Sequence, residues 1–423
     1  MRKLKVHEGK RYLMWDDGQP FFYMGDTAWE LFHKLSREEI THYFTTREKQ
    51  EFNVIQAVCL AELDGIGTPN YYGEKALEYY DKKKIVPNEK YFELIDWALD
   101  EAAKHHLVIA MLPTWGDKFN QTFGKGPQLL TPENARSYAK WLAERYSGRE
   151  NIIWVLGGDR PLENDLHREI IDAMGTTLKK YDKNHLITFH PPGAKTSSDF
   201  VAGKEYIDFH MNQSGHDVDT SFFSEEMLDK DFARDDKPAL DGESRYEDHP
   251  ACFNSKQGYF WNDADVRINV YTNILNGACG QTYGNHAVWS MNTNVTDYFT
   301  FKWNEVLNHP GAEQFHLAAR LRLSRPFFEL KAANDLLVGE SCAKPTTVAA
   351  RGKDYAFVYS PLGLPFTVNL AKMGSPRITA SWYDVKTGEI TVDGVYGPNV
   401  TRFAPVKQGK GNDIVLILDN LYL

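Results

Sequence analysis

The segment NIIWVLGGDRP, residues 151–161, joins an apolar stretch with no polar alternation to two glycines and an acid, Asp159. Such an unalternating stretch is typical of a parallel strand that is covered on both faces. Asp159 therefore lies at the point where the predicted strand would leave the core. Two interpretations are open: Asp159 caps the next helix, or it is an acid placed at a strand end for chemistry.

Seven further segments share this apolar texture and alternate with segments of helical periodicity. We predict strands at residues 21–29, 53–60, 107–115, 151–159, 185–191, 207–216, 237–244 and 279–290. Eight buried strands separated by helices over roughly 300 residues indicate a (β/α)8 barrel. A doubly wound open sheet is the alternative, but no G-x-G-x-x-G turn follows the first predicted strand.

Beyond residue 325 the texture changes. Short, alternating, β-branched segments follow at 346–360, 366–370, 377–390 and 413–420, with turn residues between them. This pattern predicts an antiparallel β-sandwich. We therefore divide the chain into a barrel domain, residues 1–325, and a C-terminal β-sandwich domain, residues 326–423.

The composition limits the kinds of partner. With 48 Lys and Arg against 58 Asp and Glu, the net charge of −10 argues against a nucleic-acid partner, whose phosphates need a positive face. The aromatic content of 13% suits a neutral, ring-shaped ligand. No segment has the length of a membrane span, and the first 15 residues contain no apolar stretch typical of a secretory signal. We expect a cytoplasmic protein with no membrane partner, and the sequence does not predict its oligomeric state.

The carboxyl ends of barrel strands line the active site in this fold. Read from the predicted strand ends, the candidate site residues are acids, aromatics, histidines and amides: Asp26, Trp29, Gln56, Glu62, Trp115, Asp159, His190, His210, Gln213, Glu243, Tyr283, His286 and Trp289. These residues together predict a pocket at the strand ends that has aromatic walls and contains several acids.

Glycoside hydrolysis needs two carboxyl groups, one to protonate the leaving oxygen and one to attack the anomeric carbon or activate water. Asp159 and Glu243 follow the fourth and seventh strands, which lie on opposite sides of a barrel axis. We predict Asp159 as the acid/base and Glu243 as the nucleophile. The structural alternatives are an N-cap role for Asp159 and an ion pair between Glu243 and Arg245.

The remaining candidates are predicted to bind substrate. Three aromatics, Trp115, Tyr283 and Trp289, would stack on sugar faces, and four residues, His190, His210, Gln213 and His286, would bind hydroxyl groups. Asp26 would bind a hydroxyl group or pair with a wall residue such as Arg160. Four histidines, His190, His210, His216 and His286, could also be metal ligands, but no H-x-H or H-E-x-x-H spacing is present. We predict no metal and no cofactor.

Eight segments, in order and nearly from end to end, resemble the apiosidase-like glycoside hydrolases. They are FFYMGDTAWELFHKLSREE, FNVIQAVCLAELDG, LPTWGDK, NIIWVLGGDRP, HLITFHP, NQSGH, LDGESRYEDHP and ACGQTYGNHAVW. The C-terminal part resembles the small β-domain of that family that is labelled collagen-binding. The resemblance implies a (β/α)8 catalytic domain, a retaining double displacement, an acid/base at Asp159 in the GGD motif and a nucleophile at Glu243 in the DGE motif.

The family's known activity releases apiose from branched pectic side chains. Its characterised members are exported, whereas an intracellular member would trim imported oligosaccharides or glycosides. The sequence therefore predicts a retaining glycosidase that acts on plant-derived or related oligosaccharides. The alternatives are a non-catalytic carbohydrate-binding protein, which could dispense with one carboxylate, and a metal-dependent hydrolase.

Overall fold

Eight parallel strands form the predicted barrel in the computed structural model, which describes residues 2–217, 224–339 and 345–421. The barrel strands are β4 (Tyr23–Thr27), β5 (Val54–Leu60), β8 (Val108–Thr114), β9 (Ile152–Gly157), β10 (Ile187–His190), β12 (His210–Gln213), β13 (Ala239–Asp241) and β14 (Gly280–Tyr283). The sheet order is β10-β9-β8-β5-β4-β14-β13-β12, with the short β11 (Lys195–Thr196) antiparallel to β12. β10 lies beside β12, where Thr188 Oγ1 donates to the Phe209 carbonyl at 2.8 Å, so the sheet nearly closes. The predicted barrel is confirmed.

The strand β9 shows why its sequence does not alternate. Ile152, Trp154 and Leu156 pack in the core between the sheet and the outer helices. Ile153 and Val155 pack in a second core, which fills the barrel interior. Both faces of the strand are therefore apolar because both are buried.

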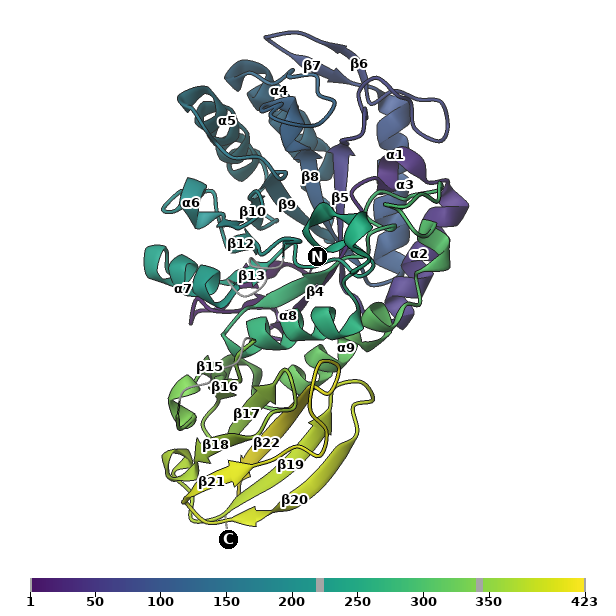
Figure 1. The fold of residues 1–423 in the computed structure, drawn as a ribbon. Helices are drawn as coiled ribbons and strands as arrows, with labels where there is room; N and C mark the ends of the chain where they lie inside the picture. Colours follow the sequence, from purple (N-terminus) through teal and green to yellow (C-terminus); the bar gives the residue numbers. More distant parts are fainter. Residues whose placement is uncertain (1, 218–223, 340–344, 422–423) are drawn as a thin grey trace.

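Helices surround the barrel on its outer face (Figure 1). They are α1 (Leu31–Lys34), α2 (Arg37–Lys49), α3 (Glu89–Lys104), α4 (Pro132–Tyr146), α5 (Asp165–Tyr181), α6 (Ser198–Val201), α7 (Ser224–Arg234), α8 (Asp263–Leu275) and α9 (Pro310–Leu323). Helix α7 begins at Ser224, directly after residues 218–223, which lie outside the described part. Side-chain caps start several helices: Ser36 forms a capping box with Glu39, and Thr131 forms one with Asn134.

Two small sheets were not predicted. The first 21 residues include β1 (Leu4–Val6), β2 (Leu13–Trp15) and β3 (Pro20–Phe21), whose Leu4, Leu13 and Phe21 join the core of the barrel interior. The long connection after β5 contains the hairpin of β6 (Leu77–Tyr80) and β7 (Ile85–Pro87). No helix in the described part of the chain is both long and apolar enough to cross a bilayer.

The C-terminal segment forms an antiparallel β-domain below the barrel in Figure 1. Its main sheet has the order β15 (Lys331–Ala332), β16 (Val348–Arg351), β17 (Tyr355–Ser360), β22 (Ile414–Asn420), β19 (Ile378–Asp384) and β20 (Ile390–Tyr396). A second layer pairs β18 (Phe366–Asn369) with β21 (Val400–Phe403). Phe366 and Phe403 of this layer share one core with Val358 and Leu416 of the main sheet.

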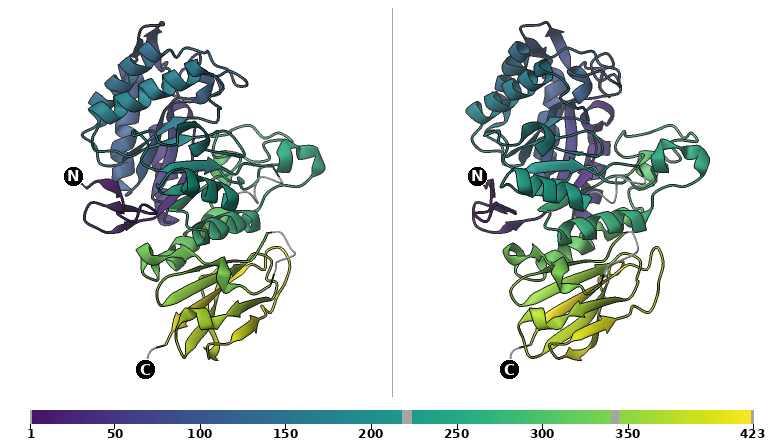
Figure 2. Two further views of the ribbon diagram at one scale, coloured as in Figure 1. Left: turned by 90° about the vertical axis from the view of Figure 1, so that its left-hand side faces the viewer. Right: turned by 60° about the vertical axis from the view of Figure 1, so that its left-hand side comes forward.

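Helices α8 and α9 lie between the barrel and the β-domain in every view (Figures 1 and 2). Arg267 of α8 and Asp413 of the β-domain form a buried ion pair, with Nε and Oδ2 at 2.9 Å. Tyr271 of α8 stacks on Tyr359 of β17 with ring centroids 5.1 Å apart. The barrel-interior core thus continues into the β-domain, and the two parts share one apolar interface.

Candidate active site

A pocket of about 400 Å³ opens at the carboxyl ends of the barrel strands. Eight of the thirteen residues predicted from the strand ends line it: Trp29, Glu62, Trp115, Asp159, Gln213, Glu243, His286 and Trp289. A concave site with aromatic walls and a few converging polar groups is the usual form of a small-ligand site. Both predicted catalytic acids therefore face the same cavity.

The chain turns sharply where β9 ends, through three consecutive residues with left-handed backbone. Gly157, Gly158 and Asp159 have φ values of 88°, 105° and 57°. A Cβ at Gly157 would lie 2.4 Å from the His190 carbonyl, and one at Gly158 would lie 2.7 Å from the Gly116 nitrogen. Only glycine fits these two positions, because both the φ value and the close backbone exclude a side chain. Asp159 is a non-glycine residue in this strained region, which is often found at functional sites.

The cap interpretation of Asp159 is wrong. Helix α5 begins at Asp165, and its N-cap is Asn164, whose side chain accepts a hydrogen bond from the His167 nitrogen. The Asp159 carboxyl instead pairs with Arg160, with Nη1 and Oδ2 at 2.8 Å, and lines the pocket. The acid is thus free of any capping role.

The environment of Asp159 favours the protonated form. Burial raises the pKa of this carboxyl most, and the nearby Glu243 raises it further. Arg160, His190 and a hydrogen bond from Gln213 act in the opposite direction, and the resulting pKa is about 6. A carboxyl group with such a pKa can hold a proton at mildly acidic pH and donate it.

Glu243 lies in the opposite electrostatic environment. His216 Nε2 is 2.9 Å from its Oε1, and His190 Nε2 is 3.1 Å from its Oε2. Burial raises the pKa of Glu243, but the two histidines lower it by more, so its pKa lies below the ordinary range. The alternative ion pair with Arg245 is not formed, because Arg245 Nη1 faces Asp265 Oδ1 at 3.3 Å. Glu243 is therefore held as a carboxylate.

His190 connects the two acids. Its Nδ1 accepts a hydrogen bond from the Asp159 backbone nitrogen at 3.3 Å. The other ring nitrogen, Nε2, faces Glu243 Oε2 at 3.1 Å. The ring is packed edge-on against Trp29, with centroids 5.3 Å apart, so its orientation is fixed. His190 does not line the pocket but positions the residues that do.

Two buried polar side chains support the backbone beside Glu243. Gln56 Nε2 donates to the Gly242 carbonyl at 2.9 Å. Asp241 Oδ1 accepts from the Glu243 nitrogen at 3.2 Å, and its Oδ2 accepts from Ser214 Oγ at 2.6 Å. Gln56 was predicted to bind substrate, and this prediction is wrong, because Gln56 lies beneath the pocket lining and is fully buried.

Three further residues predicted to contact substrate do not line the pocket, and for Asp26 the alternative of a wall partner holds, although that partner is not Arg160. Asp26 points to α2, where Tyr43 and Arg47 bind its Oδ2 at 2.5 Å. His210 begins β12 rather than ending it, and its Nδ1 lies 2.7 Å from Ser197 Oγ. The Tyr283 hydroxyl donates to Glu247 Oε2 at 2.7 Å, away from the pocket. In each case the residue lies on the strand predicted from the sequence, but at the opposite end of that strand or on the face away from the pocket.

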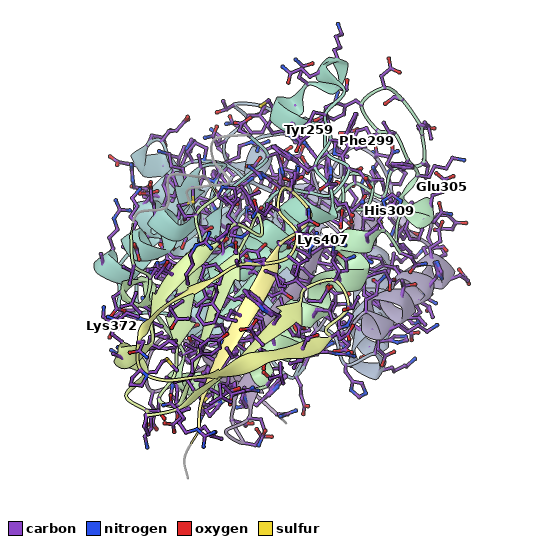
Figure 3. All side chains as sticks on the ribbon, turned by 60° about the horizontal axis from the view of Figure 1, so that its bottom comes forward. Tyr259, Phe299, Glu305, His309, Lys372 and Lys407 are labelled. Atoms are coloured by element: carbon purple, nitrogen blue, oxygen red, sulfur yellow. The ribbon has the colours of Figure 1, made fainter. Side chains whose placement is uncertain are left out.

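Several lining residues were not predicted, because they lie on loops beyond the strands. They are Phe123, Pro192, Gly193, Ala194, Gly215, His216, Asp217, Tyr246, His249, Phe253 and Tyr298. His216 had been considered only as a possible metal ligand, although its position in NQSGH directly follows β12. Phe299, on the connection after β14, stacks on His286 with centroids 4.3 Å apart; Tyr259, also labelled in Figure 3, accepts a hydrogen bond from Lys410 of the β-domain.

The described residues contain no group of three or more His, Cys, Asp and Glu side chains that could hold a metal ion. The histidines near the pocket are arranged by ring stacking instead: His216 and His249 lie 4.4 Å apart between centroids with nearly parallel rings.

A family comparison gives the identity of the catalytic part. Residues 7–329 match the family described as apiosidase-like, catalytic domain. The chain belongs to the apiosidase-like glycoside hydrolases. Residues 333–419 match a family described as "Putative collagen-binding domain of a collagenase". The protein is thus a glycosidase by family, with a second family domain at its C-terminus.

Solved structures agree with this assignment. A glycoside hydrolase shares 31% identity with a TM-score of 0.90, over 99% of this chain and 97% of the other. A family 5 glycoside hydrolase from Bacteroides vulgatus shares 30% identity with a TM-score of 0.90, over 99% and 93%. An endo-1,4-β-mannanase from Rhizomucor miehei, at 13% identity and a TM-score of 0.51 over 75% and 99%, shares the fold. A search of the curated proteins gave no match.

Proposed function

We propose that this glycoside hydrolase cleaves a glycosidic bond of an oligosaccharide or glycoside with retention of configuration. Glu243 attacks the anomeric carbon and forms a covalent glycosyl-enzyme. Asp159 protonates the leaving oxygen, and then takes a proton from the water that hydrolyses the intermediate. Atoms and charge balance over the two steps, and both carboxyl groups return to their starting state.

The opposite environments of the two acids carry this proposal. Glu243 is held ionised by His190 and His216, whereas burial and the neighbouring carboxylate raise the pKa of Asp159 to about 6. Two carboxyl groups whose environments push their pKa values apart are the usual assignment of nucleophile and acid.

The other lining residues suit a sugar. Trp115 and Trp289 present aromatic surface to the pocket. His286 is buried, and neither of its ring nitrogens has a hydrogen-bond partner among the described residues. Such a ring can bind substrate hydroxyl groups without losing an existing bond. Gln213, at the end of β12, offers its side-chain oxygen in the same way.

Plant-derived or related oligosaccharides are the proposed substrates. The match to the apiosidase-like family supports this class, and the size of the pocket, about 400 Å³, suits a short part of a saccharide. It lies near the lower end of the range of about 300–1,000 Å³ for small-ligand sites.

Replacement of each acid tests the assignment. Asp159→Asn and Glu243→Gln should each lower kcat about 100- to 10,000-fold, while the fold is retained. The exposed acids Asp16 and Glu78 provide matched controls, since Asp16→Asn and Glu78→Gln should keep full activity. Turnover within about 10-fold of the wild type in either active-site variant would refute the catalytic roles.

The stereochemical outcome is a separate measurement. Proton NMR of the first-formed product should show the anomeric configuration of the substrate, and mass spectrometry of a slow-substrate reaction should show a glycosyl group on Glu243. A product of inverted configuration would be consistent with glycosidase activity but would exclude the retaining mechanism.

A further inference from the structure

A second cavity opens on the same face of the barrel as the catalytic pocket. Its volume is about 420 Å³, close to that of the catalytic pocket. Three connections contribute to its lining: Lys34 and Leu35 after β4, Tyr71 after β5, and Met291, Asn292 and Asn294 after β14. All three connections leave the carboxyl ends of parallel strands, and β4 lies between β5 and β14 in the sheet. The second cavity therefore lies on the β4 side of the barrel mouth.

The same three connections also line the catalytic pocket. Trp29, Glu62 and Trp289 face that pocket, and each is followed along its connection by residues that line the second cavity. The step is shortest after β14, where Trp289 lines one cavity and Met291 lines the other. Two residues of chain span at most about 7 Å, so the two cavities are neighbours. A saccharide that leaves the catalytic pocket past Trp289 can therefore enter the second cavity.

Hydrogen bonds hold the segment that separates the two cavities. Lys34 Nζ donates to the Ser290 carbonyl at 2.7 Å. The backbone nitrogen of Trp303, a lining residue that is 3% exposed, donates to the Asn292 carbonyl at 2.8 Å. Between these bonds Met291 has left-handed backbone, with φ 47°, a strained conformation that is often found at functional sites. The cavity is thus preformed, and a ligand need not order this segment when it binds.

An exposed aromatic side chain forms part of the lining. Tyr71 is 61% exposed, and Tyr72 packs against it at a steep angle with ring centroids 5.2 Å apart. Tyr72 is itself held by the start of α2, because its hydroxyl accepts a hydrogen bond from the Arg37 nitrogen at 2.9 Å. Tyr71 therefore presents a supported aromatic surface, which suits the apolar side of a sugar ring.

The polar groups of the lining have free hydrogen-bonding capacity. Among the described residues, no partner bonds the side chains of Tyr71, Thr293 and Asn294. Lys34 uses one of its three ammonium protons in its bond to the separating segment. Glu39 is the one acid among the lining residues that the structure describes, whereas cleavage of a glycosidic bond takes two. The second cavity is therefore equipped to bind hydroxyl groups but not to cleave a saccharide.

We propose that the second cavity is a distal subsite, which binds a further sugar unit of the saccharide that Asp159 and Glu243 cleave. The proposal rests on the proposed glycosidase function, and it names the substrate class of that site: oligosaccharides long enough to fill both cavities. A sugar in the distal subsite gains contacts that a substrate confined to the catalytic pocket lacks. Contacts at a remote part of the substrate raise kcat/KM for long substrates only.

The role of Tyr71 is tested with substrates of two lengths. The probes are plant cell-wall oligosaccharides, prepared by partial acid hydrolysis and separated by length, and nitrophenyl glycosides, which fill only the catalytic pocket. Tyr71→Ala should lower kcat/KM about 5-fold or more for long oligosaccharides and leave it unchanged for nitrophenyl glycosides. Tyr79, an exposed tyrosine of β6 outside both cavities, is the matched control, and Tyr79→Ala should change neither value. Equal losses on both kinds of substrate, or no loss on either, would overturn the proposal.

Binding is measured separately from turnover in the variant Glu243→Gln. Titration calorimetry should show tighter binding of long than of short oligosaccharides. Addition of Asn294→Trp fills the distal subsite from an exposed loop position and should abolish this difference. Equal affinity for short and long saccharides in Glu243→Gln would overturn the proposal. Binding of long oligosaccharides that the wild type never cleaves would refute the proposed function and not the subsite.

Discussion

The carboxyl of Glu243 has an imidazole nitrogen near each oxygen, at 2.9 and 3.1 Å, whereas that of Asp159 faces Arg160 and the Glu243 carboxylate. The two side chains differ by one methylene group, so their intrinsic acidities are similar. Their neighbours therefore decide which of them holds the proton. At the scale of the residue, the role of each acid depends on the side chains that surround it.

The pH dependence of kcat/KM follows from this asymmetry. Turnover needs protonated Asp159 and ionised Glu243. Since the pKa of Asp159 is raised to about 6, activity should fall as pH rises through that value. The acid limb of the profile is the fall of kcat/KM toward low pH, where Glu243 becomes protonated. Because the pKa of Glu243 is lowered, this fall should occur at a pH below the ordinary pKa range of a glutamate. An activity that keeps increasing from pH 6 to pH 9 would contradict the assignment.

Removal of a histidine should move one limb only. His216→Asn takes away a group that lowers the pKa of Glu243, so the acid limb should move upward by about 1 pH unit or more while the alkaline limb stays. His105, which faces Glu48 far along the chain from the pocket residues, is the matched control, and His105→Asn should leave both limbs in place. A folded His216→Asn enzyme with an unshifted acid limb would separate His216 from the ionisation of Glu243.

At the scale of the element, the end of β9 converts a buried strand into an active-site loop within three residues. The backbone of Gly157 passes so close to His190 that a Cβ would meet its carbonyl at 2.4 Å. This close approach is what lets the Asp159 nitrogen reach His190 Nδ1 at 3.3 Å. The glycines therefore have a geometric role in joining β9 to β10.

The substitution Gly157→Ala should lower the free energy of unfolding by more than backbone strain alone would. Alanine at a position with left-handed backbone costs about 1–2 kcal/mol, and the contact with His190 adds to that in Gly157→Ala. Gly18 is the matched control, because its φ is also 88° but nothing lies within 4 Å of a Cβ there. Urea unfolding should show a larger loss for Gly157→Ala than for Gly18→Ala. Equal losses would mean that the backbone beside His190 relaxes freely.

At the scale of the whole molecule, the β-domain is joined to the barrel by buried charge and apolar packing. Asp413 accepts from Nε and Nη2 of Arg267, both at 2.9 Å, and from the Tyr359 hydroxyl at 3.1 Å. Helix α8 carries Arg267 on this side and Asn273 toward Asp241 beneath Glu243. The β-domain therefore supports the helix behind the strand of the proposed nucleophile.

Loss of this interface charge should destabilise the entire chain. Asp413→Ala leaves the Arg267 guanidinium buried without its main partner, which costs about 3–5 kcal/mol. The exposed pair of Asp335 and Lys372 in the same domain is the control, and Asp335→Ala should cost about 1 kcal/mol or less. Denaturant unfolding monitored in both domains should show one coincident transition for the wild type. A small effect of Asp413→Ala would mean that the domains are only loosely coupled.

The fold could be read from local sequence because burial on two faces leaves a direct signature. The segment Ile152–Gly157 has no polar position, and β5 and β8, with only Gln56 and Thr114 as polar residues, are likewise buried along their whole length. The alternating segments after residue 345 marked the antiparallel domain for the converse reason. The sheets β1–β3 and β6–β7 were missed, since their short strands lie among polar and turn residues.

The candidate site could be predicted only in part. Residues directly after a strand, such as Asp159 and Glu243, were found, because strand ends of a barrel converge. Asp26 and Tyr283 were misplaced, because the sequence does not say which side of a two-face-buried strand points inward. Phe123, His249 and Tyr298 were missed, since they reach the pocket on long loops whose paths no local pattern specifies.

The sequence by itself determined the barrel, the β-domain, the order of the strands and the two acids at their ends, because these follow from the periodicity of burial along the chain. Only the tertiary structure decided the chemistry of those acids. The pKa of each depends on groups distant in sequence: His190 and His216 beside Glu243, and Glu243 itself beside Asp159. Electrostatic interactions act through space over a few ångströms, and only the folded chain brings these groups together.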